Sequence, residues 1–597
     1  MAKPTKYSHL PLSTSGPQDC ALTGAALLRN PYLNKGTAFS AEERATFALA
    51  ASLPKQVDTL EQQLQRAYEQ LSTHRTPIGK NAFMTSMKAQ NEVLYYRLIQ
   101  EHLKELFPII YTPTEADAIA DYSRLFRQPE GCYLNIEEAE GIEAALERWG
   151  PAEDVDIIAC SDGEQILGIG DQGVGAILIS IAKLVIYTLC AGIHPNRVLP
   201  VGLDVGTDNE HLLNDDLYLG LRRPRVRGEE YDAFIDRFVH ACRKKYPRAY
   251  IHFEDFGLHN ARRILDKYAP QIACFNDDVQ GTGAVTLAAL YAALHVAKLK
   301  LKDLRIVMFG AGTAGTGIAD QIRDAIAVES EKSKEDAAQQ IWCVDKQGVL
   351  LQSQKDDLTP AQHPFARPDD EWKDSDAKSL KEIIGKVKPH VLIGTSTKPR
   401  TFTKEVVQEM AKHVDRPIIF PLSNPTRLHE ADPKDLHEWT DGKVLTATGS
   451  PFPPVTTKDG GKREIAECNN STMFPGIGLG AVLSRTKRIT SEMLVAAVKA
   501  LSAQAPALKD PDAALLPDVT DVREISVQIA AAVIKQAIKD DMAQEADIPT
   551  DDGDLAEWIR EQMWEPKYRA LRKVDKHVAD RVAKGEAGSR GAAAVHE

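Results

Sequence analysis

One glycine-rich loop, Gly310–Gly315, constrains the fold of this chain more than any other feature. Its sequence, Gly-Ala-Gly-Thr-Ala-Gly, follows a continuous apolar run and precedes a long helical pattern. Glycines at this spacing let a strand turn tightly into a helix and let backbone N–H groups approach a bound phosphate. The strand, loop and helix together predict the start of a Rossmann-like sheet. The loop, with Gly310, Gly312 and Gly315, is the candidate cradle of a dinucleotide.

Further apolar runs follow this loop at the spacing of a doubly wound parallel sheet. The runs IWCVD, HVLIGTS, PIIFPLSNP and KVLTATGS are each separated by a helical pattern. With the strand before the loop they make five buried strands, which predicts an α/β nucleotide-binding domain over residues 276–540. Residues 85–275 alternate in a similar way and predict a first α/β domain. Residues 1–84 predict a mobile arm, to about residue 20, and then helices; residues 541–597 predict a helical extension and a mobile tail.

Composition narrows the class of protein. A chain of 597 residues is too long for one hydrophobic core. A net charge of −13 argues against a nucleic acid or an anionic membrane as partner and leaves a small-molecule substrate. The eight cysteines form no C-x-x-C pair, which favours a reducing compartment. No run reaches the roughly 18 apolar residues of a membrane span. With neither a secretory signal nor a clear mitochondrial leader, we expect the cytoplasm, with the mitochondrion left open.

The same glycine pattern occurs a second time, at Gly168–Gly173. This copy carries Asp171, whose carboxylate would face the phosphates that the loop has to accept. It also follows Asp162-Gly163, a pair typical of hairpin turns. We therefore assign the cofactor to Gly310–Gly315. The first copy is interpreted as a tight turn that begins a helix, with Asp171 as a candidate N-cap.

Two segments place acidic side chains where apolar runs end. Glu254 and Asp255 close the run AYIHFEDFG, and Asp277 and Asp278 stand where a glycine-punctuated helix begins. Oxygen ligands of this kind suit Mg²⁺ or Mn²⁺. For either segment alone, helix caps and surface pairs are the favoured explanation. The neighbours in Asp277-Asp278 point in different directions, so we expect only one of them to bind the ion.

Lys183 is the only charge in an otherwise apolar helical stretch, GVGAILISIAKLVIY. Burial disfavours the ammonium form, so such a lysine can act as a base. The alternatives are a lysine that extends to the surface and one held in a structural ion pair. Tyr111 is predicted to end an apolar strand at a proline-containing turn, where it is a candidate proton donor. Asn424, Asn469 and Asn470 lie on loops after candidate strands, the edge where α/β ligands bind.

Taken together, these segments resemble one family. The stretches IIYTPT, GDQGVG, HFEDFG, FNDDVQGTGAV, FGAGTAGTGIA, PIIFPLSNPT, ATGSPFPPV and FPGIGLGAVL occur in the order and spacing of the malic enzymes. The resemblance runs from about residue 27 to about residue 570 and is strongest to the fungal branch. It implies oxidation and decarboxylation of L-malate to pyruvate with NAD⁺ or NADP⁺, a divalent cation, Mg²⁺ or Mn²⁺, and a homotetramer.

The resemblance also implies roles for the candidate residues. It makes Lys183 the general base, Tyr111 the general acid and Asp277 the carboxylate beside the lysine. The remaining roles are metal ligation by Glu254, Asp255 and Asp278, substrate contact by Asn424, Asn469 and Asn470, and cofactor binding by the three loop glycines, Asn424 and Asp345. Asp345 closes the next strand, where it could accept a hydrogen bond from the 2′-hydroxyl of NAD⁺, whereas Lys346 could pair with the 2′-phosphate of NADP⁺.

One position departs from the pattern of the family. Gln165 stands where many malic enzymes have an arginine that holds a malate carboxylate. An amide offers a hydrogen bond but no charge, so we expect Gln165 to contact the substrate and malate to bind more weakly. Malolactic enzymes, which convert malate to lactate with retained NAD, also lack this arginine. A malolactic enzyme is therefore one alternative to a malic enzyme. A non-catalytic nucleotide-binding regulator is another, although the presence of Tyr111, Lys183 and the three candidate metal ligands argues against it.

Overall fold

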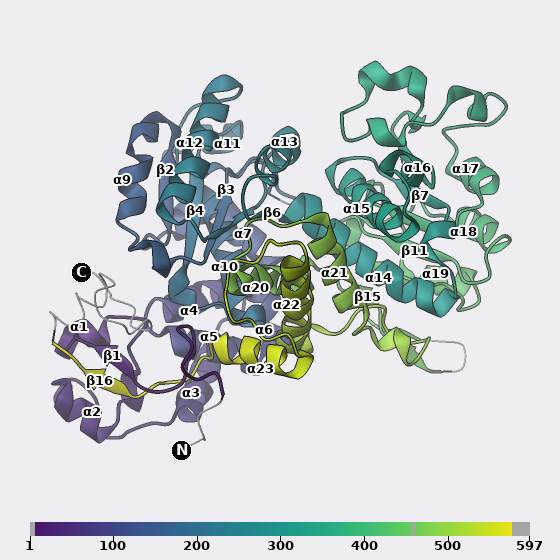
Figure 1. Ribbon diagram of the computed structural model, residues 1–597. Coiled ribbons are helices and arrows are strands. Elements are labelled where there is room, and N and C mark those ends of the chain that lie inside the picture. Colours follow the sequence, from purple (N-terminus) through teal and green to yellow (C-terminus); the bar gives the residue numbers. More distant parts are fainter. Residues whose placement is uncertain (1–5, 167, 425, 457–459, 576–597) are drawn as a thin grey trace. The chain divides into compact units, whose positions relative to one another are not determined.

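The computed structural model describes residues 6–166, 168–424, 426–456 and 460–575 (Figure 1). The chain folds into two compact units. The first contains Met1–Gly257, Ala481–Lys487 and Ala543–Glu597, and the second contains Leu258–Gly480 and Arg488–Met542. The four-part division expected from the sequence stays a prediction, and the mobile tail expected after residue 575 lies outside the described residues.

Helices build the N-terminal part of the first unit, as predicted. They are α1 (Gly24–Leu28), α2 (Ala41–Thr46), α3 (Leu60–Ser72), α4 (Pro77–Lys88), α5 (Glu92–Glu101), α6 (Leu103–Ile110), α7 (Thr114–Ala120) and α8 (Tyr122–Leu125). Helix α2 begins with a capping box: the Ser40 hydroxyl accepts from the Glu43 N–H, and the Glu43 carboxylate accepts from the Ser40 N–H. The strand expected before Tyr111 is wrong. The apolar residues there continue the helical spacing of α6, and Tyr111 caps its C-terminus.

The described part of the N-terminal arm, from residue 6, is held in place, contrary to the mobility expected up to about residue 20. Strand β1 (Gln18–Cys20) pairs in parallel with β16 (Leu571–Lys573). Arg569 donates to the carbonyl oxygens of Ser15, Gly16 and Pro17. The composition of the arm gave no sign of this, because its partner comes from the far end of the sequence.

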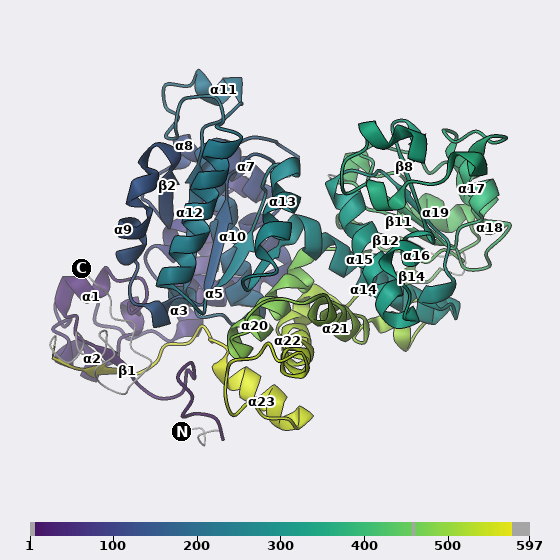
Figure 2. The same cartoon turned by 45° about the horizontal axis from the view of Figure 1, so that its top comes forward.

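A parallel sheet forms the centre of the first unit. Strands β2 (Cys132–Asn135), β4 (Val198–Asp204), β3 (Ile157–Ser161) and β5 (Tyr250–Phe253) lie side by side in this order. Helix α10 (Ile177–Ala191) packs on β3 and β4, and α12 (Glu229–Lys245) packs on α9 (Ile142–Glu147) (Figure 2). These strands are buried on both faces, which explains their continuous apolar sequences. The unit also contains α11 (Glu210–Leu213) and, near the C-terminus, α23 (Asp552–Gln562).

The second unit contains the Rossmann-like sheet predicted from the sequence. Its strand order is β11-β10-β7-β8-β9, and β7, β8, β10 and β11 are parallel. These strands are β7 (Ile306–Phe309), β8 (Ile341–Asp345), β9 (Gly348–Val349), β10 (Val391–Gly394) and β11 (Ile418–Pro421). Helix α18 (Lys404–Ala411) packs between α17 (Leu380–Val387) and α19 (Pro433–Trp439) (Figure 1).

The fifth strand of this sheet differs from the prediction. It is β9, which runs antiparallel to β8 because the chain reverses at Gly348, where φ is +102°. The run KVLTATGS contributes only an isolated bridge from Leu445 to Ile418 and the short strand β12 (Ala447–Thr448), paired with β15 (Ala466–Glu467). The run therefore lies next to β11 at one residue but forms no strand of the sheet.

Helices before, within and after the sheet sequence complete the second unit. They include α13 (Leu258–Tyr268), α14 (Thr282–Ala297), α15 (Thr313–Ser330), α16 (Lys334–Ala338), α21 (Ser491–Ser502) and α22 (Val522–Lys539). The short strand β6 (Cys274–Asn276) leads through a π-helical turn, Asp277–Gly281, into α14. Helix α14 packs on α15 and α21, and α21 packs on α22.

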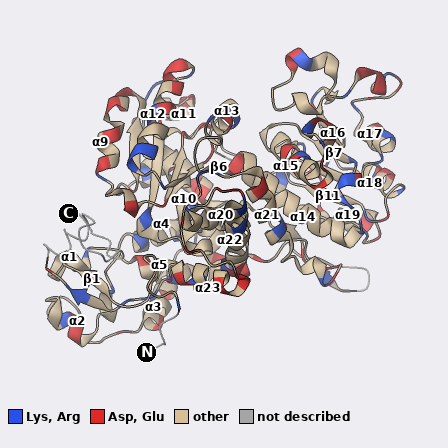
Figure 3. Ribbon diagram, in the orientation of Figure 1, with Lys and Arg blue, Asp and Glu red and all other residues tan. Residues whose placement is uncertain are grey.

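Two segments are long and apolar enough to cross a membrane by length and composition, which the sequence argument had excluded. They are Gly173–Ala191 and Asp277–Ala297, with mean hydropathies of 2.1 and 1.3. The protein buries 89% of the first window and 72% of the second, so they have the burial of core helices. The eight cysteines are all buried and none forms a disulfide. Acidic and basic residues are mixed along the helices (Figure 3).

Candidate active site

Lys183 is buried on helix α10 and paired with a carboxylate of the neighbouring strand. Its Nζ lies 3.0 Å from Oε1 of Glu254, and each side chain is only 2% exposed. Helix α10 is apolar almost throughout and covers β3 and β4, so a lysine in its middle turn cannot reach water. Of the alternatives left open by the sequence, extension to the surface is wrong: the lysine is buried and ion-paired, and its role as a base stays a prediction.

Glu254 in turn belongs to a chain of buried polar side chains. Its Oε2 lies 2.7 Å from Nε2 of His252, and Nδ1 of His252 lies 3.0 Å from the hydroxyl of Tyr187. His252 and Tyr187 are fully buried. Tyr187 is one helical turn after Lys183 on α10, so both side chains lie on one face of the helix. Tyr187 contacts His252 on β5, and Lys183 contacts Glu254, which directly follows β5. The sequence showed neither His252 nor Tyr187 as functional.

Tyr111 lies beside the lysine. The Nζ of Lys183 is 5.3 Å from the centroid of the Tyr111 ring, and Tyr111 is 6% exposed. The ring also makes an edge contact with Phe107, one turn earlier on α6. A buried phenol beside a buried lysine is a pair that can exchange and deliver protons.

The chain after β5 turns sharply at Asp255. This residue has φ of +52°, a left-handed conformation that is uncommon outside glycine, and it is 2% exposed. Its carbonyl oxygen accepts a hydrogen bond from the Gln165 N–H at 3.3 Å. The Gln165 backbone therefore lies beside Asp255, while its side chain is exposed.

The first glycine loop is an ion-paired turn. The Asp171 carboxylate accepts hydrogen bonds from Nε of Arg225 at 2.6 Å, from the Thr207 hydroxyl at 2.8 Å and from the Gly173 N–H at 3.0 Å. The residues from Gly173 to Ala176 form a 3₁₀ turn that continues into α10. The predicted tight turn before a helix is confirmed. Asp171 itself is not the N-cap, because that position is one residue later.

Arg225 joins this turn to a second buried acid. It donates to the Asp162 carbonyl oxygen at 2.7 Å, and the Tyr231 hydroxyl donates to the Asp162 carboxylate at 2.6 Å. Burial raises the pKa of Asp162, against the lowering effect of Arg225 and Tyr231. The sequence did not indicate this group, because nothing in the run RRPRVRG distinguishes the buried Arg225 from the other arginines.

The second glycine loop has the predicted strand, turn and helix. Gly310 follows β7 with φ of +106°, and Gly312 precedes the first residue of α15. A Cβ at Gly315 would lie 1.9 Å from the Gly310 carbonyl oxygen, so the close approach of helix and strand requires glycine there. A Cβ at Gly312 would meet nothing within 4 Å, which leaves open space in front of the helix N-terminus.

Asp345 is the last residue of β8, beside the strand that carries the glycine loop. Its carboxylate accepts from the Lys346 N–H at 2.8 Å and from the Gln362 side-chain amide at 3.3 Å. The same amide donates to the Ala311 carbonyl oxygen, within the loop. Gln362 therefore links Asp345 to the glycine loop, and Lys346 is exposed.

The predicted site residues of the second unit differ in their burial and in their hydrogen-bond partners. The Asn470 amide donates to the Asp277 carboxylate at 3.0 Å, and Asp277 is 1% exposed. Asn469 caps a short 3₁₀ turn, and its amide donates to Glu467. The Asn424 side chain accepts a hydrogen bond from the Ser450 hydroxyl and is exposed. Asp278, next to Asp277, is half-buried in the π-helical turn.

A glycine loop between a parallel strand and a helix, with an acid at the end of the next strand, defines an α/β protein with a dinucleotide-binding domain. Two family models match the chain: "Malic enzyme, N-terminal domain" over residues 88–269 and "Malic enzyme, NAD binding domain" over residues 279–538. The chain belongs to the malic enzyme family.

Named relatives agree with this assignment. The chain is 50% identical over 578 residues to the mitochondrial NAD-dependent malic enzyme of Saccharomyces cerevisiae, covering 94% of this chain and 85% of that one. It is 48% identical over 565 residues to the NAD-dependent malic enzyme of Schizosaccharomyces pombe, covering 94% and 100%. The predicted resemblance to the fungal branch is confirmed. Among solved structures, the fold is similar to Entamoeba histolytica malic enzyme, with a TM-score of 0.54, 22% identity and coverage of 91% and 94%.

Proposed function

We propose that this protein oxidises L-malate with NAD⁺ and decarboxylates it to pyruvate and CO₂. The observation that carries the proposal is the buried pair of Lys183 and Glu254 with Tyr111 beside it, in a member of the malic enzyme family. The relatives at 43–50% identity are named NAD-dependent malic enzymes. None of the comparisons favours the malolactic or the non-catalytic alternative.

We infer that Glu254, Asp255 and Asp278 hold a divalent cation, Mg²⁺ or Mn²⁺. Their chemistry fits such an ion, because all three offer hard carboxylate oxygens, and Glu254 and Asp255 are buried. Burying two adjacent carboxylates costs free energy that a bound cation offsets. When bound, the ion polarises the oxygen on C2 of malate and of the keto acid formed from it.

In this proposal Lys183 and Tyr111 move the protons. Lys183, in its neutral form, takes the proton of the C2 hydroxyl as hydride passes from C2 to the nicotinamide. Loss of the C4 carboxylate as CO₂ leaves C3 in need of a proton, which the Tyr111 hydroxyl donates. Asp277, the carboxylate that the family resemblance places with the lysine, is oriented by Asn470. Asn424, Asn469 and Gln165 are proposed to orient the malate carboxylates.

The glycine loop and Asp345 are proposed to hold NAD. Backbone N–H groups at Gly310, Gly312 and Gly315 and the N-terminus of α15 would face the pyrophosphate. Asp345 would accept from the 2′-hydroxyl of the ribose, and its carboxylate would repel the 2′-phosphate of NADP. Lys346, exposed next to it, would favour NADP. We therefore propose a preference for NAD with residual use of NADP.

The assembly and location of the protein are also proposals. The family resemblance implies a homotetramer. We propose the cytoplasm as its location, with the mitochondrion as the alternative because one relative is named mitochondrial.

One assay tests the reaction. Purified protein is incubated with L-malate, Mn²⁺ and either NAD⁺ or NADP⁺, while nicotinamide reduction, pyruvate and lactate are measured. Reduced cofactor and pyruvate in equal amounts support the proposal. Lactate without net reduction would instead support a malolactic enzyme, and the absence of both products would support a regulator.

A further inference from the structure

The strand order of the Rossmann-like sheet decides which segments each half of NAD would meet. Strands β11, β10, β7 and β8 are parallel neighbours in this order, so their carboxyl ends share the edge where ligands of such sheets bind. With the pyrophosphate at the glycine loop after β7 and the adenosine ribose at Asp345, the other half of the cofactor extends over the ends of β10 and β11. Residues 395–397 and 422–424, which follow these two strands, would then face the nicotinamide.

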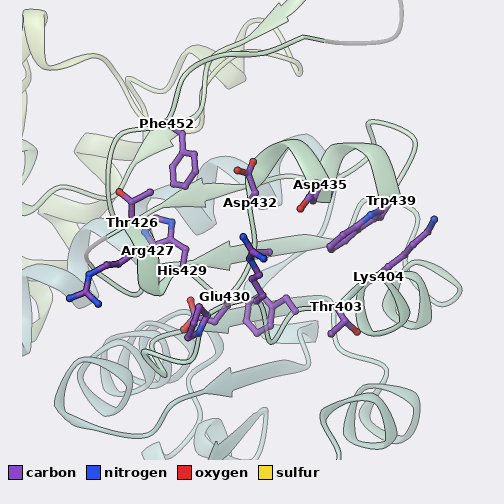
Figure 4. Close-up of a pocket in the computed structure, with 14 residues that line it drawn as sticks. Thr403, Lys404, Thr426, Arg427, His429, Glu430, Asp432, Asp435, Trp439 and Phe452 are labelled. Atoms are coloured by element: carbon purple, nitrogen blue, oxygen red, sulfur yellow. The ribbon is translucent and has the colours of Figure 1, made fainter.

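A buried carboxylate joins these two segments. Glu430 is fully buried and lies in the chain after β11, next to His429 (Figure 4). Its Oε1 accepts hydrogen bonds from the Ser396 N–H at 2.8 Å, from the Ser396 hydroxyl at 2.8 Å and from the Ser423 hydroxyl. Gly394 ends β10 and leaves room for this side chain, since a Cβ there would lie 2.5 Å from Cδ of Glu430. One oxygen therefore fixes the chain just after β10 and just after β11.

The glycine loop holds the first residue after β10 without help from Glu430. The Thr395 hydroxyl donates to the Gly310 carbonyl oxygen at 2.8 Å. A Cβ at Gly310 would lie 2.5 Å from the carbonyl carbon of Thr395, so the two backbones are in contact. Loss of the Glu430 carboxylate would therefore leave the pyrophosphate cradle supported. It would release the residues farther along, Ser396 and Thr397, together with Ser423.

Thr397 has a conformation that needs such support. Its φ is +54°, in the left-handed region that a β-branched residue rarely adopts. Its N–H donates to the Ser423 hydroxyl at 2.8 Å, and that hydroxyl donates to Glu430. Residues in such conformations persist where the surrounding structure holds them, and they are concentrated at functional sites. The Ser423 hydroxyl thus passes the restraint from Glu430 to Thr397.

We propose that Glu430 is a positioning residue of the NAD site, which holds the segments after β10 and β11 in the arrangement that accepts the nicotinamide half of the cofactor. It acts through Ser396 and Ser423 and does not itself touch the cofactor. Its loss is costly, because buried donors that lose their acceptor have no water to replace it. Asn424 directly follows Ser423, so its backbone is positioned by the same contact. The inference rests on the proposed use of NAD.

Binding of NADH and of ADP by the full-length protein tests this role. ADP carries the adenosine half and both phosphates, but neither the second ribose nor the nicotinamide. Glu430→Met keeps the length of the side chain and removes its acceptor oxygens. In calorimetric titrations we expect it to weaken NADH binding at least about tenfold and ADP binding at most about twofold. Glu430→Gln should recover most of the NADH affinity, because its amide oxygen can accept in place of Oε1.

Two further variants complete the test. Ser423→Ala removes the hydroxyl that links Glu430 to Thr397, so it should also weaken NADH binding more than ADP binding, even where Glu430→Met fails to fold. Thr440→Val is the matched control. It removes a buried hydroxyl whose two hydrogen bonds stay within α19 and the turn after it, and it should leave both affinities unchanged.

The outcomes separate this role from general support of the fold and from the proposed reaction. Equal losses of NADH and ADP affinity in the Glu430 and Ser423 variants would overturn the proposal, and so would unchanged NADH affinity in Ser423→Ala. A wild-type protein that does not bind NADH would overturn the proposed function as well. Reduction of NAD⁺ by the wild-type protein, with an unchanged ratio of the two affinities in the variants, would overturn only the role of Glu430.

Discussion

The ammonium nitrogen of Lys183 and a carboxylate oxygen of Glu254 lie 3.0 Å apart, and each side chain is 2% exposed. Moving two charges out of water costs about as much as their attraction returns, so such a pair is weak evidence for stability. A base must also be able to lose its proton, which burial favours. Reaction chemistry therefore explains this pair better than folding does.

Replacing Lys183 by methionine separates these two roles. We expect kcat to fall by about 10²–10⁴-fold, the usual contribution of a general base. The variant should also lose about 3–5 kcal/mol of stability, because Glu254 keeps a buried charge without its partner. Rates of NAD⁺ reduction and denaturant unfolding measure the two effects. The double variant Lys183→Met/Glu254→Gln should recover stability and stay inactive; recovery of activity would contradict the role of the lysine.

Two alanine substitutions in the glycine loop should act differently. Gly315→Ala places a Cβ 1.9 Å from a backbone oxygen, so we expect a lower melting temperature and loss of NAD⁺ binding. Gly312→Ala meets no atom within 4 Å, so the fold should stay intact while the methyl group blocks the approach of the pyrophosphate. Fluorescence titration with NADH and thermal unfolding check this. Normal NADH binding by Gly312→Ala would show that the cofactor binds elsewhere than at this loop.

Asp345 and Lys346 are expected to set cofactor preference in opposite directions. Asp345→Ser should raise KM for NAD⁺ and lower KM for NADP⁺, because the carboxylate no longer accepts from the ribose or repels a phosphate. Lys346→Ala should affect only NADP⁺. The measurement is kcat/KM with both cofactors at fixed malate and Mn²⁺. If the ratio of kcat/KM for NAD⁺ to kcat/KM for NADP⁺ is unchanged in the Asp345 variant, Asp345 does not contact the cofactor.

Glu92 gives the protein a pH-dependent stability. Burial raises its pKa to about 8, so the folded protein keeps a proton that the unfolded chain releases above its ordinary pKa of 4.5. Stability should therefore fall as pH rises from about 4.5 to about 8 and then level off. Glu92→Gln should flatten this slope and gain about 3–5 kcal/mol at pH 8. Some slope remains, because burial also raises the pKa of Glu115 to about 8.

Chemical denaturation at several pH values measures this effect. Glu42→Gln is the control, since Glu42 is exposed on α2. If the two variants follow the same pH profile, Glu92 is ionised in the folded protein.

Arg225 should contribute far more to stability than the nearby Arg227. It is 7% exposed and lies between Asp162 and Asp171, so Arg225→Leu leaves two acids without their cation. We expect a loss of about 3–5 kcal/mol. Arg227→Ala, at an exposed ion pair, should cost at most about 1 kcal/mol. Similar melting temperatures for the two variants would show that the buried network adds nothing.

The features best predicted from the sequence are those formed by residues close to one another along the chain. The order of β7, the glycine loop and α15 is local, and it is as expected. Periodicity alone could not tell that the residues before Tyr111 form a helix, because a short apolar run fits either structure. Partners distant in sequence, such as Arg225 for Asp171 or His252 for Glu254, depend on tertiary packing and leave no local pattern.

The pairing of β1 with β16 has a consequence for synthesis of the chain. Cys20 belongs to a buried cluster with Leu27, Phe39 and Phe47, and Leu571 packs against it. During translation the ribosome releases these N-terminal residues long before it makes Leu571. The cluster therefore remains open on one side until the last strand emerges, and a chain that stops early exposes apolar surface at its own beginning. Chaperones bind exposed apolar surface of this kind. Synthesis of the segment with Leu571 is therefore the step that covers the N-terminal cluster.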